Sequence, residues 1–152
     1  MNLSTNLSLL EVTKSQTAVR HGIDNTPNAA QLENLKRVSE KVFQPIREHF
    51  NTPIYISSGF RCEDLNTRIG GSRTSSHCKG EALDLDMDGR GSITNRQIFD
   101  YVRANLQFDQ LIYEFGDDQN PGWVHISYKK AGNRNQVLKA AKINGKTNYS
   151  VM

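Results

Sequence analysis

The stretch that decides the fold is residues 82–87, Ala-Leu-Asp-Leu-Asp-Met, in which apolar and polar residues alternate. Side chains of a β-strand point alternately to its two faces, so this pattern predicts a strand with its leucines and its methionine in the core. Asp84 and Asp86 then face away from the core. For an isolated strand, a polar face turned to solvent is the simpler explanation of such an alternation.

Two further strands are predicted downstream, at residues 110–115 (Gln-Leu-Ile-Tyr-Glu-Phe) and 123–128 (Trp-Val-His-Ile-Ser-Tyr). The segment between them, residues 116–122, is Gly-Asp-Asp-Gln-Asn-Pro-Gly, which is typical of a turn, so we expect an antiparallel hairpin. A shorter buried strand is expected at residues 54–56. On the strand at 123–128, His125 would share the outward face with a serine, while a valine and an isoleucine face the core.

Apolar residues at intervals of three and four predict two amphipathic helices. The first spans about residues 28 to 49, with Thr26 as its expected cap and Pro45 bending its end. The second spans residues 94–106, and a short helix is expected at residues 61–69. The sum predicts an α+β fold, in which helices pack on one side of a small, mostly antiparallel sheet.

Length and composition limit the class of protein. The chain has 152 residues, of which 36% are hydrophobic, so we expect one domain spanning residues 1–152. Within it, residues 1–27 form an N-terminal arm, and residues 133–152 form a tail for which no element is predicted. The net charge is +3 without a basic block, so no nucleic-acid partner is expected. No apolar run approaches the roughly 20 residues of a membrane span, so we expect no membrane insertion.

The N-terminal segment and the cysteines bear on localisation. Residues 1–15 lack the basic start and the sustained apolar stretch of a secretory signal, so synthesis in the cytoplasm is expected. Cys62 and Cys78 indicate neither a disulfide scaffold nor a CxxC zinc site. We expect both to be reduced in a cytoplasm, with a single bridge between them as the less favoured alternative.

The candidate metal ligands are His77, Asp84 and His125. His77 lies in the loop that leads into the strand of Asp84, and His125 lies on the outward face of another strand of the sheet. Neutral imidazole and carboxylate are good Zn²⁺ ligands, and three protein ligands with one open position form the catalytic arrangement. One zinc ion per chain is therefore expected. A single histidine is more often a packed or surface residue, which is how we interpret His21 and His49.

Glu114 is the candidate for proton transfer, because this acid interrupts the apolar run of its strand on the same predicted face. It would take a proton from a zinc-activated water and deliver it to the leaving amine. Exposure on an edge strand is the alternative for Glu114 taken alone. Asp118, in the turn-rich loop that follows, is the reserve acid.

These residues resemble a known family. Residues 76–84, together with Ser75, match the pattern S-x-H-x-x-G-x-A-x-D, and residues 123–127 match the element W-V-H-[IV]-S. Residues 58–61 are similar to S-G-[FY]-R. Together they resemble the zinc D-Ala-D-Ala carboxypeptidase family, peptidoglycan-cleaving metallopeptidases that share a fold with the hedgehog signalling domain. The resemblance extends from about residue 8 to about residue 138 and is to the family's compact bacterial and phage branch.

The resemblance implies that His77, Asp84 and His125 are zinc ligands and that Arg61 contacts the substrate and steadies the oxyanion. An arginine fork suits both tasks, because it can pair with a carboxylate or stabilise charge developing on a carbonyl oxygen. A salt bridge at a helix end is the alternative for Arg61. Ser75 would hydrogen-bond the substrate or cap the loop.

The sequence departs from the family pattern at two positions. One is Cys78, beside the candidate ligand His77, whose thiol could bind metal adventitiously but would point away from His77 in an extended segment. In several relatives the catalytic acid lies three residues before the last histidine, where this chain has Gly122. Glu114 matches the acid at the end of the L-I-x-E strand in the compact branch, so the role is expected there. Asp86 is either a partner that orients a histidine or, as we favour, a solvated surface acid.

The resemblance implies a zinc peptidase that hydrolyses the stem peptides of peptidoglycan. It would act as a D-Ala-D-Ala carboxypeptidase or as an endopeptidase on a bond such as L-Ala-D-Glu, and we expect a monomer. A phage-type lysis enzyme (an endolysin) would act on the cell wall or in the periplasm after release by another protein, whereas a cytoplasmic dipeptidase would need no release. The alternative is a catalytically inactive, zinc-containing binding module of the same fold.

Overall fold

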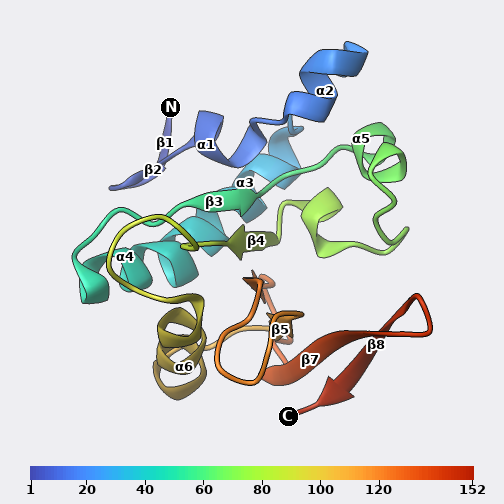
Figure 1. Cartoon of the computed structure of the whole chain (residues 1–152). Helices are drawn as coiled ribbons and strands as arrows, with labels where there is room; N and C mark the ends of the chain where they lie inside the picture. Colours follow the sequence, from blue (N-terminus) through green and yellow to red (C-terminus); the bar gives the residue numbers. More distant parts are fainter.

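The computed structural model describes residues 1–152 and is built around one six-stranded sheet (Figure 1). Across the sheet the strands are β3 (Ile56–Ser58), β4 (Ala82–Leu85), β6 (Trp123–Ser127), β5 (Gln110–Glu114), β7 (Gln136–Ile143) and β8 (Lys146–Val151). Every neighbouring pair is antiparallel except β5 and β7, which run parallel. The predicted mostly antiparallel sheet is therefore confirmed.

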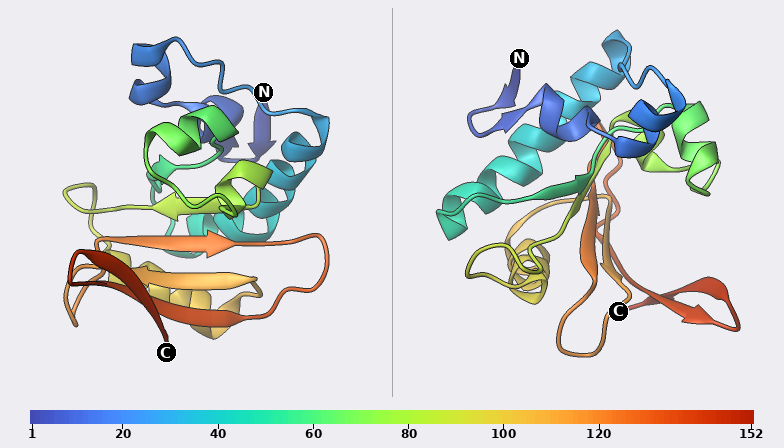
Figure 2. Two further views of the ribbon diagram at one scale, coloured as in Figure 1. Left: turned by 90° about the vertical axis from the view of Figure 1, so that its right-hand side faces the viewer. Right: turned by 45° about the horizontal axis from the view of Figure 1, so that its top comes forward.

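Three helices cover one face of this sheet: α3 (Ala29–Val38), α4 (Gln44–Phe50) and α6 (Asn95–Asn105) (Figure 2, right). Between them and the sheet lies a single large core. The strands contribute Leu83, Leu85, Leu111, Tyr113, Val124 and Ile126, and the helices contribute Leu35, Val38, Ile46, Ile98, Phe99 and Val102. The α+β class with helices on one side is confirmed, and the alternating residues of β4 and β6 put Asp84 and His125 on the other face.

The first long helix differs in detail from its prediction. Asn28, and not Thr26, caps α3, because its side chain accepts the Gln31 N–H at 2.8 Å and the Gln31 side chain accepts the Asn28 N–H in return. A π-helical turn, η1 (Ser39–Phe43), separates α3 from α4. It ends two residues before Pro45, which has no N–H for the carbonyl four residues earlier, so the α-helical hydrogen bonds are interrupted just before this proline.

The N-terminal segment folds onto the β3 end of the sheet. It forms β1 (Asn2–Ser4), β2 (Leu7–Ser8), α1 (Leu9–Thr13) and α2 (Gln16–His21). Val12 of α1 is buried in the main core, and its carbonyl accepts the Phe60 N–H at 2.7 Å, which fixes α1 against the residues after β3. The strand expected at residues 54–56 begins only at Ile56, and a short helix, α5 (Glu63–Arg68), follows.

The C-terminal residues, for which no element was predicted, form the β7–β8 hairpin. Its two-residue turn is Asn144-Gly145, both with positive φ (52° and 76°), which is the geometry that favours this dipeptide in hairpins. The hairpin leans away from the sheet on the side opposite α6 (Figure 2). None of the helices combines the length and the apolar character that crossing a membrane requires.

Candidate metal centre

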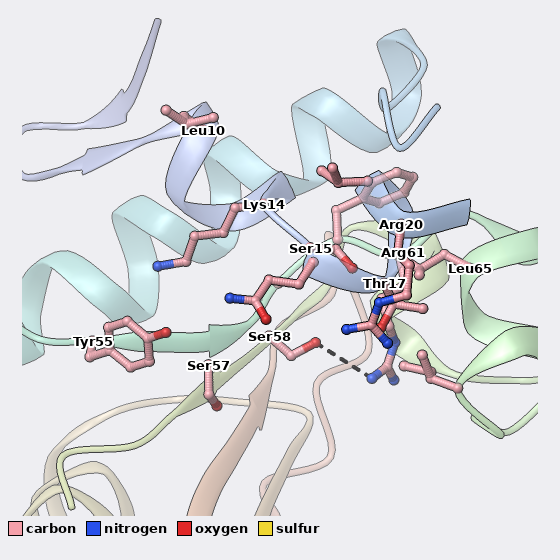
Figure 3. Close-up of a pocket in the computed structure, with 15 residues that line it drawn as sticks. Leu10, Lys14, Ser15, Thr17, Arg20, Tyr55, Ser57, Ser58, Arg61 and Leu65 are labelled. Carbon is pink, nitrogen blue, oxygen red and sulfur yellow. Dashed lines mark hydrogen bonds between the residues drawn. The ribbon is translucent and has the colours of Figure 1, made fainter. Parts of the chain in front are cut away.

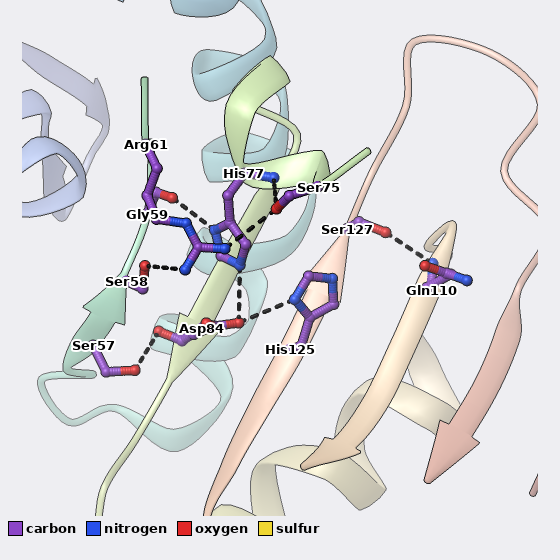
Figure 4. Close-up of polar contacts among 10 residues, drawn as sticks. All are labelled: Ser57, Ser58, Gly59, Arg61, Ser75, His77, Asp84, Gln110, His125 and Ser127. Atoms are coloured by element: carbon purple, nitrogen blue, oxygen red, sulfur yellow. Dashed lines mark hydrogen bonds and ion pairs between the residues drawn. The ribbon is translucent and has the colours of Figure 1, made fainter. Parts of the chain in front are cut away.

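The three predicted metal ligands converge on the face of the sheet opposite α3, α4 and α6 (Figure 4). Asp84 on β4 and His125 on β6 are direct neighbours in the strand register, and His77 reaches them from the short helix η2 (Ser76–Lys79). One ligand atom of each residue lies within 4.8 Å of those of the other two. Asp84 Oδ1 lies 3.2 Å from His77 Nε2 and 3.0 Å from His125 Nδ1.

The segment around His77 is shaped by its neighbours in the sequence. Ser75 caps η2 by accepting the His77 N–H at 3.2 Å, and Gly80 ends the helix with a φ of 75°. A Cβ at position 80 would meet the Gln31 carbonyl and, at 3.2 Å, the Leu35 side chain, both on α3. A serine before the histidine and a glycine three residues after it therefore let η2 lie tightly against α3 and hold the imidazole in place.

The orientation of the His77 ring is fixed by a backbone group. Its Nδ1–H donates to the Gly59 carbonyl at 2.7 Å, so Nε2 of the neutral ring carries a lone pair. That lone pair faces the Asp84 carboxylate, and two acceptors 3.2 Å apart repel each other unless a proton or a cation lies between them. Two imidazoles and one carboxylate are also a ligand set of catalytic zinc sites. The residues present therefore fit a zinc ion.

The Asp84 carboxyl is buried, which by itself would raise its pKa. The imidazoles of His77 and His125, both within hydrogen-bond distance, outweigh burial and lower the pKa of Asp84 well below its usual 3.8. Asp84 therefore keeps the negative charge that a metal ligand requires.

Glu114 lies on the same face, one row further along the sheet. It ends β5 two residues after Ile112, which is the register partner of His125, and its own partners are Trp123 on β6 and Ala140 on β7. Burial raises the pKa of the Glu114 carboxyl to about 7; His125 opposes this shift and the charge of Asp84 adds to it. A carboxyl with such a pKa can both accept and release a proton near neutral pH.

Arg61 lies on the other side of the three candidate ligands. Its guanidinium donates to Ser75 Oγ at 3.2 Å and to Ser58 Oγ at 3.5 Å, and its buried Nε has no partner (Figure 4). No carboxylate pairs with it, so the salt bridge considered as an alternative is absent. Ser75 both caps η2 and holds the guanidinium, so it is a positioning group in this structure.

Other predicted acids lie outside this group. The Asp118 side chain is 90% exposed and pairs with Lys139 at 3.0 Å, on the opposite face of the sheet from Glu114. The structure thus does not bring the reserve acid to the cluster. Asp86 follows the end of β4 and accepts the Asn95 amide at 3.0 Å, which ties it to α6 and not to a histidine.

The remaining histidines and the two cysteines lie outside the metal centre. His21 is exposed, and His49 stacks on Tyr101 in the last turn of α4, with ring centroids 4.0 Å apart. Cys62 and Cys78 are both free and half-buried. None of these four belongs to the group that could hold a metal.

Two features of the site were not predicted. The Gly59 carbonyl that orients His77 is a backbone group, and only its place in the S-G-F-R element hinted at a role. Tyr149 on β8 lies in one row across the sheet with Ala140 and Glu114. Partial burial, then the negative charges of Glu114 and Asp84, raise the pKa of the Tyr149 hydroxyl, so the C-terminal hairpin brings an aromatic side chain to the rim of the site.

Comparison with known proteins gives one match. The model of a family described as Peptidase M15 matches residues 5–127, a segment that contains all three candidate ligands as well as Arg61 and Glu114. The β7–β8 hairpin lies outside the matched segment. No curated protein matches the chain.

Proposed function

This chain belongs to the peptidase M15 family, as its motifs predicted, and we propose that it hydrolyses peptide bonds in the stem peptides of peptidoglycan. The family comprises zinc-dependent metallopeptidases of the D-Ala-D-Ala carboxypeptidase type. The observation that carries the proposal is the convergence of His77, Asp84 and His125, each with a ligand atom within 4.8 Å of the others.

The metal would be held by His77, Asp84 and His125, all three of which are buried. Held there, a zinc ion would supply Lewis-acid chemistry for amide hydrolysis, acting on a water molecule and on the scissile carbonyl. The Gly59 carbonyl keeps the His77 ring in the tautomer that leaves Nε2 free for the metal. The chain's own contribution is thus a His77 ring whose orientation is set by the Gly59 carbonyl and not by the ion.

Glu114 is the residue that moves the proton in this proposal. Its carboxylate takes the proton of the attacking water and returns it to the nitrogen of the departing amine. It lies on the same face as His125, with Trp123 and Ala140 on the neighbouring strands, and is only 7% exposed, so bulk water is largely kept from the group.

Arg61 binds the substrate on the opposite side of the candidate ligands. Its guanidinium is oriented by Ser58 and Ser75 and has no carboxylate partner, so it is available to a group of the ligand. That group is either a substrate carboxylate, bound in a two-pronged manner, or the oxygen of the scissile carbonyl as it gains negative charge.

The test is digestion of defined peptidoglycan fragments, with the products identified by mass. Loss of a terminal alanine identifies a D-Ala-D-Ala carboxypeptidase, and cleavage between L-Ala and D-Glu identifies an endopeptidase. We expect Glu114→Gln to lower kcat by at least about 100-fold while the zinc content per chain is unchanged. The matched control is Glu40→Gln, because Glu40 is exposed on η1 and far in sequence from every site residue.

Two results would contradict the proposal in different ways. A wild-type protein that binds zinc and fragments but releases no product would be a binding module and not an enzyme. Full activity of Glu114→Gln would remove this residue from the proton transfer and leave the rest of the proposal in place.

A further inference from the structure

A groove of about 900 Å³ runs along the outer edge of the sheet, between β3 and the helices α1 and α2 (Figure 3). Three cationic side chains line it, those of Lys14, Arg20 and Arg61, and no carboxylate does. None of the three takes part in an ion pair. The groove is therefore positively charged and its charges are available to a ligand.

One end of the groove adjoins the metal centre. Arg61 lines this end, and Gly59, also part of the lining, accepts the hydrogen bond of His77. Ser58 in the groove is the register partner of Asp84 on the neighbouring strand, so the two lie about 5 Å apart across the sheet. A peptide held at the metal centre can therefore continue into the groove without leaving the surface.

Tyr55 lines the other end of the groove, and two cations lie over its ring: Lys14, which also lines the groove, and Arg90, which borders it from outside. Lys14 Nζ lies 4.3 Å and the Arg90 guanidinium carbon 3.5 Å from the centroid of the Tyr55 ring. Both cations are exposed, and neither has a carboxylate within ion-pair distance. Neither cation is neutralised by a carboxylate, so this end of the groove has a positive potential that attracts an anionic group.

The spacing between the two ends sets the position of that anion in the substrate. From Ser58, beside Asp84, to Tyr55 is three residues of extended chain, or about 10 Å. An extended peptide that lies along β3 therefore reaches the Lys14–Arg90 pair with the residue about three positions from its scissile bond.

We propose that the groove is a second binding site for the peptide substrate, and that Lys14 and Arg90 bind a carboxylate carried about three residues from the scissile bond. This inference rests on the proposed function and adds a preference to it. Substrates with a free carboxylate at that position are favoured over the same substrates in which it is an amide. Salt weakens the preference, because both cations are exposed.

The experiment uses two pentapeptides, L-Ala-D-isoglutamyl-L-Lys-D-Ala-D-Ala and its analogue with the isoglutamate carboxylate amidated. The third residue before the terminal bond carries the carboxylate in the first peptide only. Binding to the full chain is measured by calorimetric titration at low salt, and kcat/KM is measured for both peptides. We expect the wild type to favour the acidic peptide about tenfold in both measurements, as a charge-assisted hydrogen bond provides.

The variant Lys14→Ala/Arg90→Ala is expected to reduce this tenfold preference to about one. The matched control is Lys41→Ala/Arg103→Ala, which removes the same charge at two exposed positions outside the groove and should keep the preference. Equal treatment of the two peptides by the wild type, cleavage only between L-Ala and D-isoglutamate, or an unchanged preference in the groove variant overturns the inference and leaves the proposed function standing. If the wild type neither binds nor cleaves either peptide, both proposals fail together.

Discussion

Adding zinc to the metal-free protein should raise its thermal stability, because the three candidate ligands already lie close together in the folded chain. His77, Asp84 and His125 are already buried and within 4.8 Å of one another, so the native state can bind the ion with little rearrangement. The three residues come together only in the folded chain, so the unfolded state binds it far more weakly. Zinc therefore stabilises the fold by mass action.

The magnitude follows from linkage. At a free zinc concentration of 100 times Kd, the free energy of unfolding rises by about 2.7 kcal/mol. A domain of this length gains about 2–4 °C in Tm for each kcal/mol, so we expect the Tm of the chelator-treated protein to rise by about 5–11 °C. Thermal unfolding followed by circular dichroism, at several zinc concentrations, measures this rise.

Two variants make the measurement specific. Asp84→Asn keeps the shape of the side chain but loses the charged ligand, so the zinc-dependent rise in Tm should disappear at the same concentrations. His21→Ala removes an exposed histidine that does not belong to the group and should keep the full rise. The assignment of these ligands would be refuted if zinc did not change the Tm of the wild type, or if it raised the Tm of Asp84→Asn as much as that of the wild type.

Three further predictions concern stability. Gly59→Ala places a Cβ against the backbone of Val12, so we expect the free energy of unfolding to fall by about 1–3 kcal/mol and zinc affinity to fall with it, as denaturant titration with and without zinc would show. Arg134 donates two hydrogen bonds of 2.9 Å to Asp109 and lowers the pKa of that buried carboxyl below 3.8. The pair therefore stabilises the folded state fully above about pH 4, and this stabilisation is lost as the pH falls through the lowered pKa. Asp109→Asn should cost about 1.5–3 kcal/mol at pH 7 and progressively less at lower pH, and a constant difference would contradict this account. Phe43→Ala removes a side chain that is 1% exposed and leaves a cavity in the core, so the free energy of unfolding should fall by about 3–5 kcal/mol in the same titration. A fall below about 1 kcal/mol would show that the core repacks to fill the cavity.

The helices and strands with regularly spaced apolar residues were predictable, because that spacing indicates which face of each element is buried. The strand of Asp84, the hairpin of β5 and β6, and the two long helices occur where they were expected. Their ends were less predictable. The helix is capped by Asn28 and not by Thr26, because Asn28 exchanges hydrogen bonds with Gln31, whereas the Thr26 hydroxyl donates to Asp24.

The C-terminal hairpin was missed although its turn dipeptide, Asn144-Gly145, is a strong hairpin signal. Its strands gave no such signal, because β8 is exposed throughout and β7 buries only Leu138 and Ala140. The parallel pairing of β7 with β5 also joins segments that are 26 residues apart in register, which no local pattern encodes.

The candidate ligands were predictable because the family motifs and the alternation of apolar and polar residues in the strands indicated the same residues. The groups that surround these ligands could not be predicted from the sequence. The Gly59 carbonyl acts through the backbone, and the approach of Tyr149 to Glu114 depends on the small side chain of Ala140 between them in the sheet. Such neighbours follow from strand register, which is a property of the folded chain.

The course of β8 has a practical bearing on how the protein is prepared. Met152 donates its N–H to the Val137 carbonyl at 3.0 Å, three residues after Tyr149, so any polypeptide that follows residue 152 begins beside the rim of the site. An affinity tag or a fluorescent fusion at this end would crowd the substrate, and a hexahistidine sequence there would compete for the ion. A tag at Met1 lies at the far end of the molecule from the β7–β8 hairpin (Figure 1), but the Met1 carbonyl accepts the N–H of Leu9, next to Leu10 of the groove, so assays should use protein from which the tag has been removed.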